Sequence, residues 1–102
     1  MEVNYSKSGD IMMIKIAGAI DTASAQQLFK NFPKLLEIPG INHFHLDLSK
    51  VSAISSMGIS GLLKFYQSVN KLMKEFEIIA ISDYLHDQFI DMQLDRIFTI
   101  RG

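Results

Sequence analysis

Two neighbouring hydroxyl groups, those of Ser55 and Ser56, are the side chains of this sequence best placed to do chemistry. They end a polar stretch of small residues, 52–56, which precedes apolar residues spaced three and four apart. That spacing predicts a helix over about residues 57–73. A serine at the start of a helix accepts a hydrogen bond from a free N–H group of the first turn. We therefore expect Ser55 or Ser56 to cap this helix.

A second set of chemically capable side chains is His43, His45 and Asp47, which alternate along a predicted strand and so share one face of it. Imidazole and carboxylate groups at this spacing can chelate a metal ion. No fourth ligand is evident, and His86 is the one remaining histidine. The alternative is a polar sheet face beside solvent, and we favour it. We therefore predict no metal site and no cofactor.

Other catalytic patterns are missing from the sequence. The chain has no cysteine, which excludes disulfides, thiolate catalysis and cysteine-based zinc sites. The segment Gly58–Gly61 has the wrong spacing for a G-x-S-x-G nucleophile elbow, and no P-loop, G-x-G-x-x-G or H-E-x-x-H motif occurs. We predict that the protein is not an enzyme.

Four aspartates follow one another at intervals of four residues: Asp83, Asp87, Asp91 and Asp95. Like charges at this spacing on a helix repel one another by a few tenths of a kcal/mol per pair. The row is either a solvated face or a surface for a basic partner, and we favour the solvated face.

The elements that must position these groups form an α/β pattern in one domain, residues 1–102. The expected strands are residues 2–6, 11–16, 42–48, 76–81 and 97–100, and the expected helices begin at Asp21, at about Met57 and at Ser82 or Asp83. Pro33 in the first helix predicts a kink or a tightened last turn. Repeated β-α-β units predict a mixed, mainly parallel sheet of about five strands with three helices and an antiparallel opening hairpin.

The composition is that of a soluble protein, with 48% hydrophobic residues and a formal net charge of −1. Near-neutral charge gives no basic surface for a nucleic acid or a membrane. There is no run of eighteen apolar residues, and the first ten residues are polar. We expect a cytoplasmic protein that binds neither nucleic acid nor membrane. The oligomeric state stays open.

The segment LDLSKVSAISSMGISGLL, residues 46–63, resembles the STAS family, whose small members are bacterial anti-sigma-factor antagonists. The corner typical of that family is Asp-Ser-[Ser/Thr/Ala]-Gly-[Leu/Ile]-Gly, and residues 55–60 of this chain are Ser-Ser-Met-Gly-Ile-Ser. The segment Gly18–Ala23 also resembles the family's G-x-[LI]-D-x-x-[TS]-A stretch, with Asp21 as the matching acid. The resemblance covers nearly all of the chain.

The resemblance implies a STAS fold and a partner protein, either an anti-sigma factor that is a serine kinase or a related switch kinase. It places the phosphorylatable serine at Ser56, with Ser55 as the alternative acceptor. The implied partner-binding residues are Asp21, Ser55, Ser56, Met57, Gly58, Ser60 and Lys64. The kinase would bring ATP and magnesium.

The predicted position of Ser56 gives phosphorylation a physical consequence. A phosphate at a helix N-terminus meets free N–H groups and the positive end of the helix dipole, so the folded protein tolerates it. It also adds about −1.5 to −2 charges, which would expel a closely packed partner. Two alternatives remain: Ser56 could be a helix cap with no further role, or the domain could be a STAS scaffold or ligand sensor without the phosphoswitch. Ser55, in place of the family's aspartate, and Met57 motivate the last of these.

Overall fold

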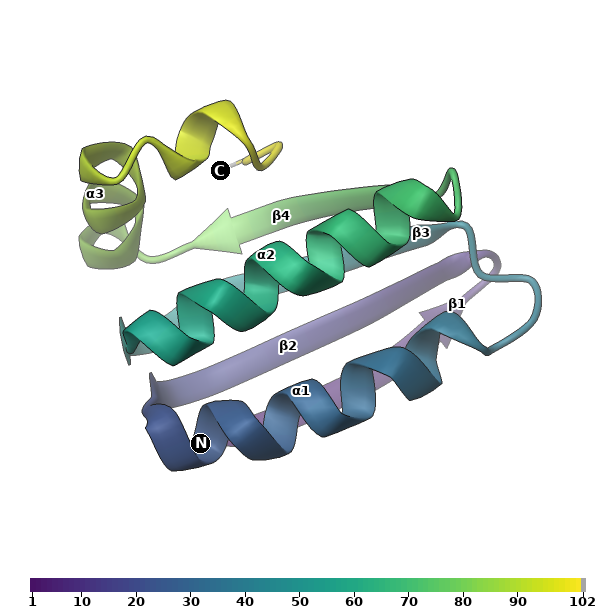
Figure 1. Ribbon diagram of the computed structural model, residues 1–102, viewed down its shortest axis with the longest axis horizontal. Helices are drawn as coiled ribbons and strands as arrows, with labels where there is room; N and C mark the ends of the chain where they lie inside the picture. The colour runs from purple at the N-terminus through teal and green to yellow at the C-terminus, as the bar shows by residue number, and fades with distance from the viewer. Residues whose placement is uncertain (102) are drawn as a thin grey trace.

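The computed structural model describes residues 1–101 and shows one mixed sheet with helices packed against it (Figure 1). The strands are β1 (Glu2–Ser8), β2 (Ile11–Ile20), β3 (His43–Ile54) and β4 (Glu75–Ile81), and the helices are α1 (Thr22–Leu36), α2 (Ser56–Lys71), α3 (Asp83–Asp91) and the 3₁₀ helix η1 (Leu94–Arg96). The sheet order is β1-β2-β3-β4. β1 and β2 pair in antiparallel fashion, whereas β2–β3 and β3–β4 are parallel. The α/β class and the mainly parallel sheet are confirmed.

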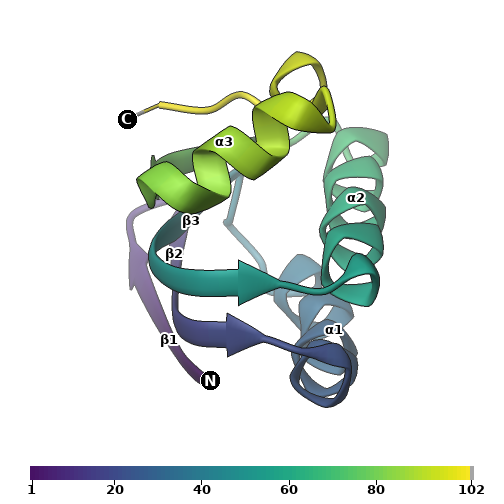
Figure 2. The same cartoon turned by 90° about the vertical axis from the view of Figure 1, so that its left-hand side faces the viewer.

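Helices α1 and α2 lie on one face of the sheet, and among residues 1–101 no helix covers the opposite face (Figure 2). The core lies between the two layers. Ile14, Leu46 and Ile78 form a row across β2, β3 and β4, and each is fully buried. Alternation along β3 explains this arrangement, because every second side chain points toward the helices and the others point toward solvent.

Two glycines set how closely α2 approaches its neighbours. A Cβ on Gly61 would lie 1.9 Å from Cε2 of Phe29, so the aromatic ring from α1 occupies the space that any other residue would fill. A Cβ on Gly58 would lie 2.6 Å from Cγ1 of Ile54. Because both positions lack a side chain, α2 packs closely against α1 at Gly61 and against the end of β3 at Gly58.

The predicted fifth strand, residues 97–100, is not formed. The sheet has four strands, and this segment contributes one isolated bridge in which Ile100 lies beside Ile78. The helix α3 ends at Asp91, and the chain then turns through η1. Phe98 is buried whereas Ile97 is exposed, so the segment is anchored by a side chain.

The first helix continues through Pro33 to Leu36. Its end is tightened as predicted, because the Glu37 N–H donates to the Lys34 carbonyl and the Ile38 N–H to the Leu35 carbonyl, each three residues earlier. Among residues 1–101, none of the helices has the length and apolar character needed to span a bilayer.

Candidate functional site

The ends of β2 and β3 bring the starts of α1 and α2 together. Ile20 and Ile54, the last residues of these strands, are paired in the sheet. One residue later the Ser55 N–H donates a 2.8 Å hydrogen bond to the carbonyl of Ile20. Both helices therefore begin at the same end of the sheet, where β2 and β3 end, and they start side by side (Figure 1).

Each of these helices begins at a polar cap. A carboxylate oxygen of Asp21 accepts a 2.8 Å hydrogen bond from the Ser24 N–H, and Oγ of Ser55 accepts a 3.1 Å hydrogen bond from the Gly58 N–H. The hydrogen bonds from Ser24 hold the pKa of Asp21 below its ordinary value, and the positive charge of the N-terminus contributes to the same shift. Asp21 is therefore an exposed anion beside the start of α2.

The sequence left open whether Ser55 or Ser56 caps α2, and the structure assigns the cap to Ser55. Ser56 is the first residue of the helix and is exposed. Met57 beside it has 40% of its surface exposed. The capping role therefore falls to one hydroxyl and leaves the other accessible at the surface.

The remaining predicted partner-binding residues lie along the same helix. Ser60 and Lys64 are exposed and follow Ser56 at intervals of four residues, which places the three on one stripe of α2. Gly58 differs because it is buried against Ile54. Its contribution is to let the start of α2 lie close to the strand ends. We call the exposed surface of Asp21, Ser56, Met57, Ser60 and Lys64 the docking face.

The N-terminus also lies at this end of the sheet, which sequence analysis did not predict. A Cβ on Gly18, near the end of β2, would come within 3.4 Å of Cα of Met1. Gly18 has a φ of 93°, in the region that favours glycine. The structure extends β2 to Ile20, beyond the predicted end at residue 16, so Gly18 lies inside the strand, where a glycine is typical of a close backbone approach.

The histidines and Asp47 do share the uncovered face of the sheet, but each has a different neighbour. His43 Nε2 lies 3.6 Å from a carboxylate oxygen of Asp10, and His45 Nε2 lies 3.6 Å from one of Glu77. Within residues 1–101 no three side chains of the types that ligate metals are gathered closely enough to hold an ion.

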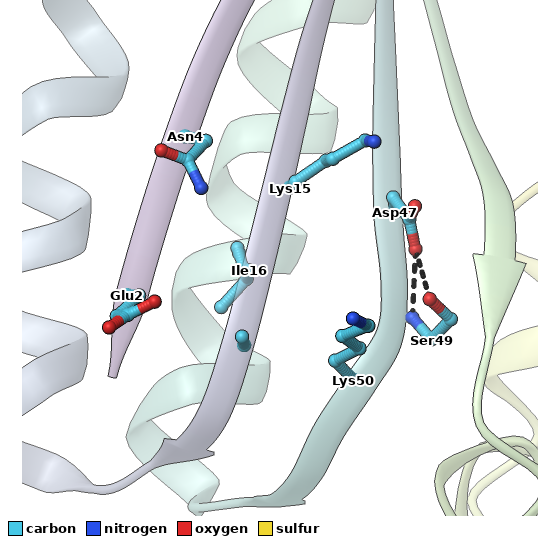
Figure 3. Close-up of a pocket in the computed structure, with 8 residues that line it drawn as sticks. Glu2, Asn4, Lys15, Ile16, Asp47, Ser49 and Lys50 are labelled. Atoms are coloured by element: carbon cyan, nitrogen blue, oxygen red, sulfur yellow. Dashed lines mark hydrogen bonds between the residues drawn. The ribbon is translucent and has the colours of Figure 1, made fainter.

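Asp47 belongs to a separate polar basin that is lined by residues of β1, β2 and β3 (Figure 3). Its carboxylate accepts hydrogen bonds from the Ser49 N–H at 3.0 Å and the Ser49 hydroxyl at 2.6 Å. Partial burial pushes the pKa of Asp47 upward, but these hydrogen bonds and the charges of Lys15 and Lys50 outweigh it and hold the pKa below its ordinary value. Two ammonium groups beside the carboxylate oppose a bound cation, so the metal hypothesis has no support from this geometry.

The four aspartates Asp83, Asp87, Asp91 and Asp95 are all exposed. Three of them lie on α3, and Asp95 lies in η1. In the part of the chain that the structure describes, none of them takes part in an ion pair. The arrangement matches the solvated face that we favoured.

Sequence analysis missed an apolar groove between α1 and α2, which has a volume of about 250 Å³. We call it the α1–α2 groove; its lining includes Phe29, Phe32, Leu36, Lys64, Phe65 and Ser68. No local pattern marks it, because the phenylalanines that line it come from two helices far apart in the chain. The groove adjoins the docking face, since Lys64 belongs to both.

The fold is shared with solved structures of bacterial regulators. An anti-sigma factor antagonist from Mycobacterium paratuberculosis is 19% identical, with a TM-score of 0.86 over 99% of this chain and 85% of that one. A candidate anti-sigma factor antagonist from Thermotoga maritima is 21% identical, with a TM-score of 0.88 over 98% and 86%. The Bacillus protein SpoIIAA is 11% identical; in its phosphorylated form the TM-score is 0.77 over 99% and 92%. At these identities the likeness is one of fold.

The sequence itself identifies the family. A model of the STAS domain matches residues 2–102, which is nearly the whole chain. This match agrees with the four-stranded mixed sheet and with the corner between β3 and α2. The chain therefore belongs to the STAS domain family.

Proposed function

We propose that this STAS domain is a regulatory binding module of the anti-sigma-factor-antagonist type. In its unmodified form it binds an anti-sigma factor that is a serine kinase, or a related switch kinase, and phosphorylation of Ser56 releases it. The domain acts in the cytoplasm as a binding partner and not as an enzyme, and the kinase supplies ATP and magnesium.

The observation that carries this proposal is the accessibility of Ser56 at the start of α2. Ser55 provides the hydrogen bond that caps the helix, so the Ser56 hydroxyl has no such structural duty. Ser56 is exposed, and the exposed side chain of Met57 lies next to it. A kinase can reach this hydroxyl without unfolding any part of the helix.

Charge supports release on phosphorylation. A phosphoserine carries about −1.5 to −2 charges at neutral pH. Asp21, whose lowered pKa keeps it ionised, caps the neighbouring helix, so the phosphate would make the docking face strongly negative. A partner that packs closely against this face, or that offers its own acidic groups there, would be repelled. The helix N-terminus stabilises the phosphate itself, so the domain stays folded.

The first experiment compares wild-type protein with Ser56→Asp and Ser6→Asp as baits for capture from the source cells. Ser6 is an exposed serine on β1, so its variant adds the same charge away from the docking face. We expect wild type and Ser6→Asp to capture a serine kinase that mass spectrometry identifies, and Ser56→Asp to lose it. Equal capture of that kinase by all three baits would contradict the phosphoswitch.

The second experiment supplies the captured kinase with ATP and magnesium and maps the phosphate by mass spectrometry. Phosphate should appear on Ser56 in wild type and should be absent from Ser56→Ala. Phosphate on Ser55 alone would move the switch to the capping residue.

A STAS scaffold or ligand sensor without the switch is the second candidate. The Ser55 hydroxyl favours it, because this position offers a neutral oxygen engaged with Gly58 where the family has a carboxylate. Persistent lack of phosphate on both serines, with the kinase still bound, would support this candidate.

A further inference from the structure

The α1–α2 groove has an aromatic floor. Phe32 and Phe65 are stacked with their ring centroids 4.2 Å apart, and each is only 3% exposed. Phe29 continues this surface, with its ring 5.2 Å from Phe32. Leu36 adds an aliphatic wall from α1. The hollow between the helices is thus lined mainly by carbon and is suited to an apolar group.

The polar side chains of the groove come from α2, and the charged group among them is a cation. Lys64 supplies an ammonium group and Ser68, one helical turn later, a hydroxyl. No carboxylate belongs to the lining, and among residues 1–101 Lys64 takes part in no ion pair. A ligand that matches both parts of this surface has a hydrocarbon chain and one negatively charged head.

The size of the groove limits the length of such a chain. Its volume of about 250 Å³ equals that of roughly eight water molecules in the liquid. A methylene group is similar in size to a water molecule, so a chain of about eight carbons fills the space. We propose that the α1–α2 groove binds a medium-chain carboxylate, with the chain on the three phenylalanine rings and the carboxylate at Lys64. This inference does not depend on the proposed phosphoswitch.

The test is a titration of the full chain with octanoate, 1-octanol and hexanoate, followed by amide chemical shifts in NMR spectra. Octanoate should shift amides of α1 and α2 that border the groove. It should bind about fifteenfold more tightly than hexanoate, because each buried methylene contributes about fourfold. No saturable shifts at the groove, or shifts centred elsewhere, would overturn the proposal and leave the groove as a seat for an apolar side chain of a protein.

Two variants separate charge from nonspecific apolar binding. Lys64→Gln should weaken octanoate about fivefold and leave 1-octanol unchanged, since one partly exposed ion pair is lost. Lys71→Gln is the matched control, because Lys71 is an exposed lysine on the same helix outside the lining. Equal octanoate affinity in the two variants would overturn the assignment of the carboxylate to Lys64. Both substitutions lie at the surface, so neither threatens the fold.

Discussion

At the level of single residues, two adjacent serines have different duties. Ser55 caps α2, and Ser56 occupies the first helical position with its surface exposed. Ser55→Ala removes the acceptor of the Gly58 N–H and should lower the free energy of unfolding by about 1 kcal/mol. Ser56→Ala should change it by less than about 0.5 kcal/mol. Urea denaturation followed by circular dichroism measures both.

Comparing the stabilities of these two variants also provides a control for the binding experiments. If Ser56→Ala were the more destabilising change, Ser56 would have a structural role and its phosphorylation would disturb the fold. The stabilities of the two variants thus decide whether lost binding by a Ser56 variant reports on the docking face or on folding.

The sequence predicted a serine cap but could not choose between the two hydroxyls. That choice depends on where β3 ends, which the predicted strand placed at residue 48 and the structure places at Ile54. Pairing with β2 extends the strand, because Ile20 lies opposite Ile54. Such pairing is a tertiary interaction, and the local pattern of polar and apolar residues does not contain it.

At the level of elements, the packing of α1 on α2 depends on one glycine. Gly61→Ala would place a methyl group about where the Phe29 ring now lies, so we expect a loss of about 1–3 kcal/mol in the free energy of unfolding. The ring and the methyl group compete for one space. The cost of Gly61→Ala should therefore be smaller in a Phe29→Ala background, and urea denaturation of the four proteins in this double-mutant cycle measures the difference. Strict additivity of the two substitutions would contradict the contact.

The elements themselves were largely predictable, and the clearest error, the last strand, has a physical cause. The order of strands and helices follows from apolar periodicity, and the three α-helices begin at or within about one residue of their expected starts. The prediction of the last strand was wrong because residues 97–100, which are all apolar or β-branched, have the local pattern of a strand. In the fold, Phe98 turns into the core, and the segment reaches β4 only around Ile78, where Thr99 and Arg101 exchange backbone hydrogen bonds with that residue. The tightened end of α1 is one of the two outcomes that Pro33 led us to expect, the other being a kink.

At the level of the whole molecule, the protection of backbone amides from hydrogen exchange should be highest in the centre of the sheet. β3 has a strand on each side, whereas the segment after η1 is attached to β4 at Ile78 and through an ion pair between Arg101 and Glu77. Hydrogen exchange should therefore be slowest for β3 amides and much faster for amides of residues 99–101, which open locally.

A charge variant makes this prediction specific to the ion pair. Glu77→Gln should speed exchange at residues 99–101 and leave β3 unchanged, whereas Glu75→Gln, on the same strand, should change exchange in neither segment. Equal protection of the C-terminal segment and β3 would show that this segment unfolds together with the sheet.

The fold class and the corner between β3 and α2 could be inferred from the sequence, because both depend on short patterns and on a family resemblance. The α1–α2 groove and the polar basin at Asp47 could not. Each is made by residues far apart in the chain, such as Phe29 with Phe65 or Lys15 with Asp47, which meet only after the sheet has set the spacing of its strands and helices.

The position of Met1 beside Gly18 has a practical consequence for every binding experiment on this domain. Any purification tag or fusion protein joined ahead of Met1 would emerge beside Asp21 and the start of α2. It would shield the surface whose partners are sought and mimic the loss of binding ascribed to a modified serine. Baits and biosensor proteins should therefore be tethered through residues added after Gly102, since the preceding residue, Arg101, lies alongside Ile78 of β4. Comparing one bait tethered at its N-terminus with one tethered at its C-terminus would show how much of the docking face a tag obstructs.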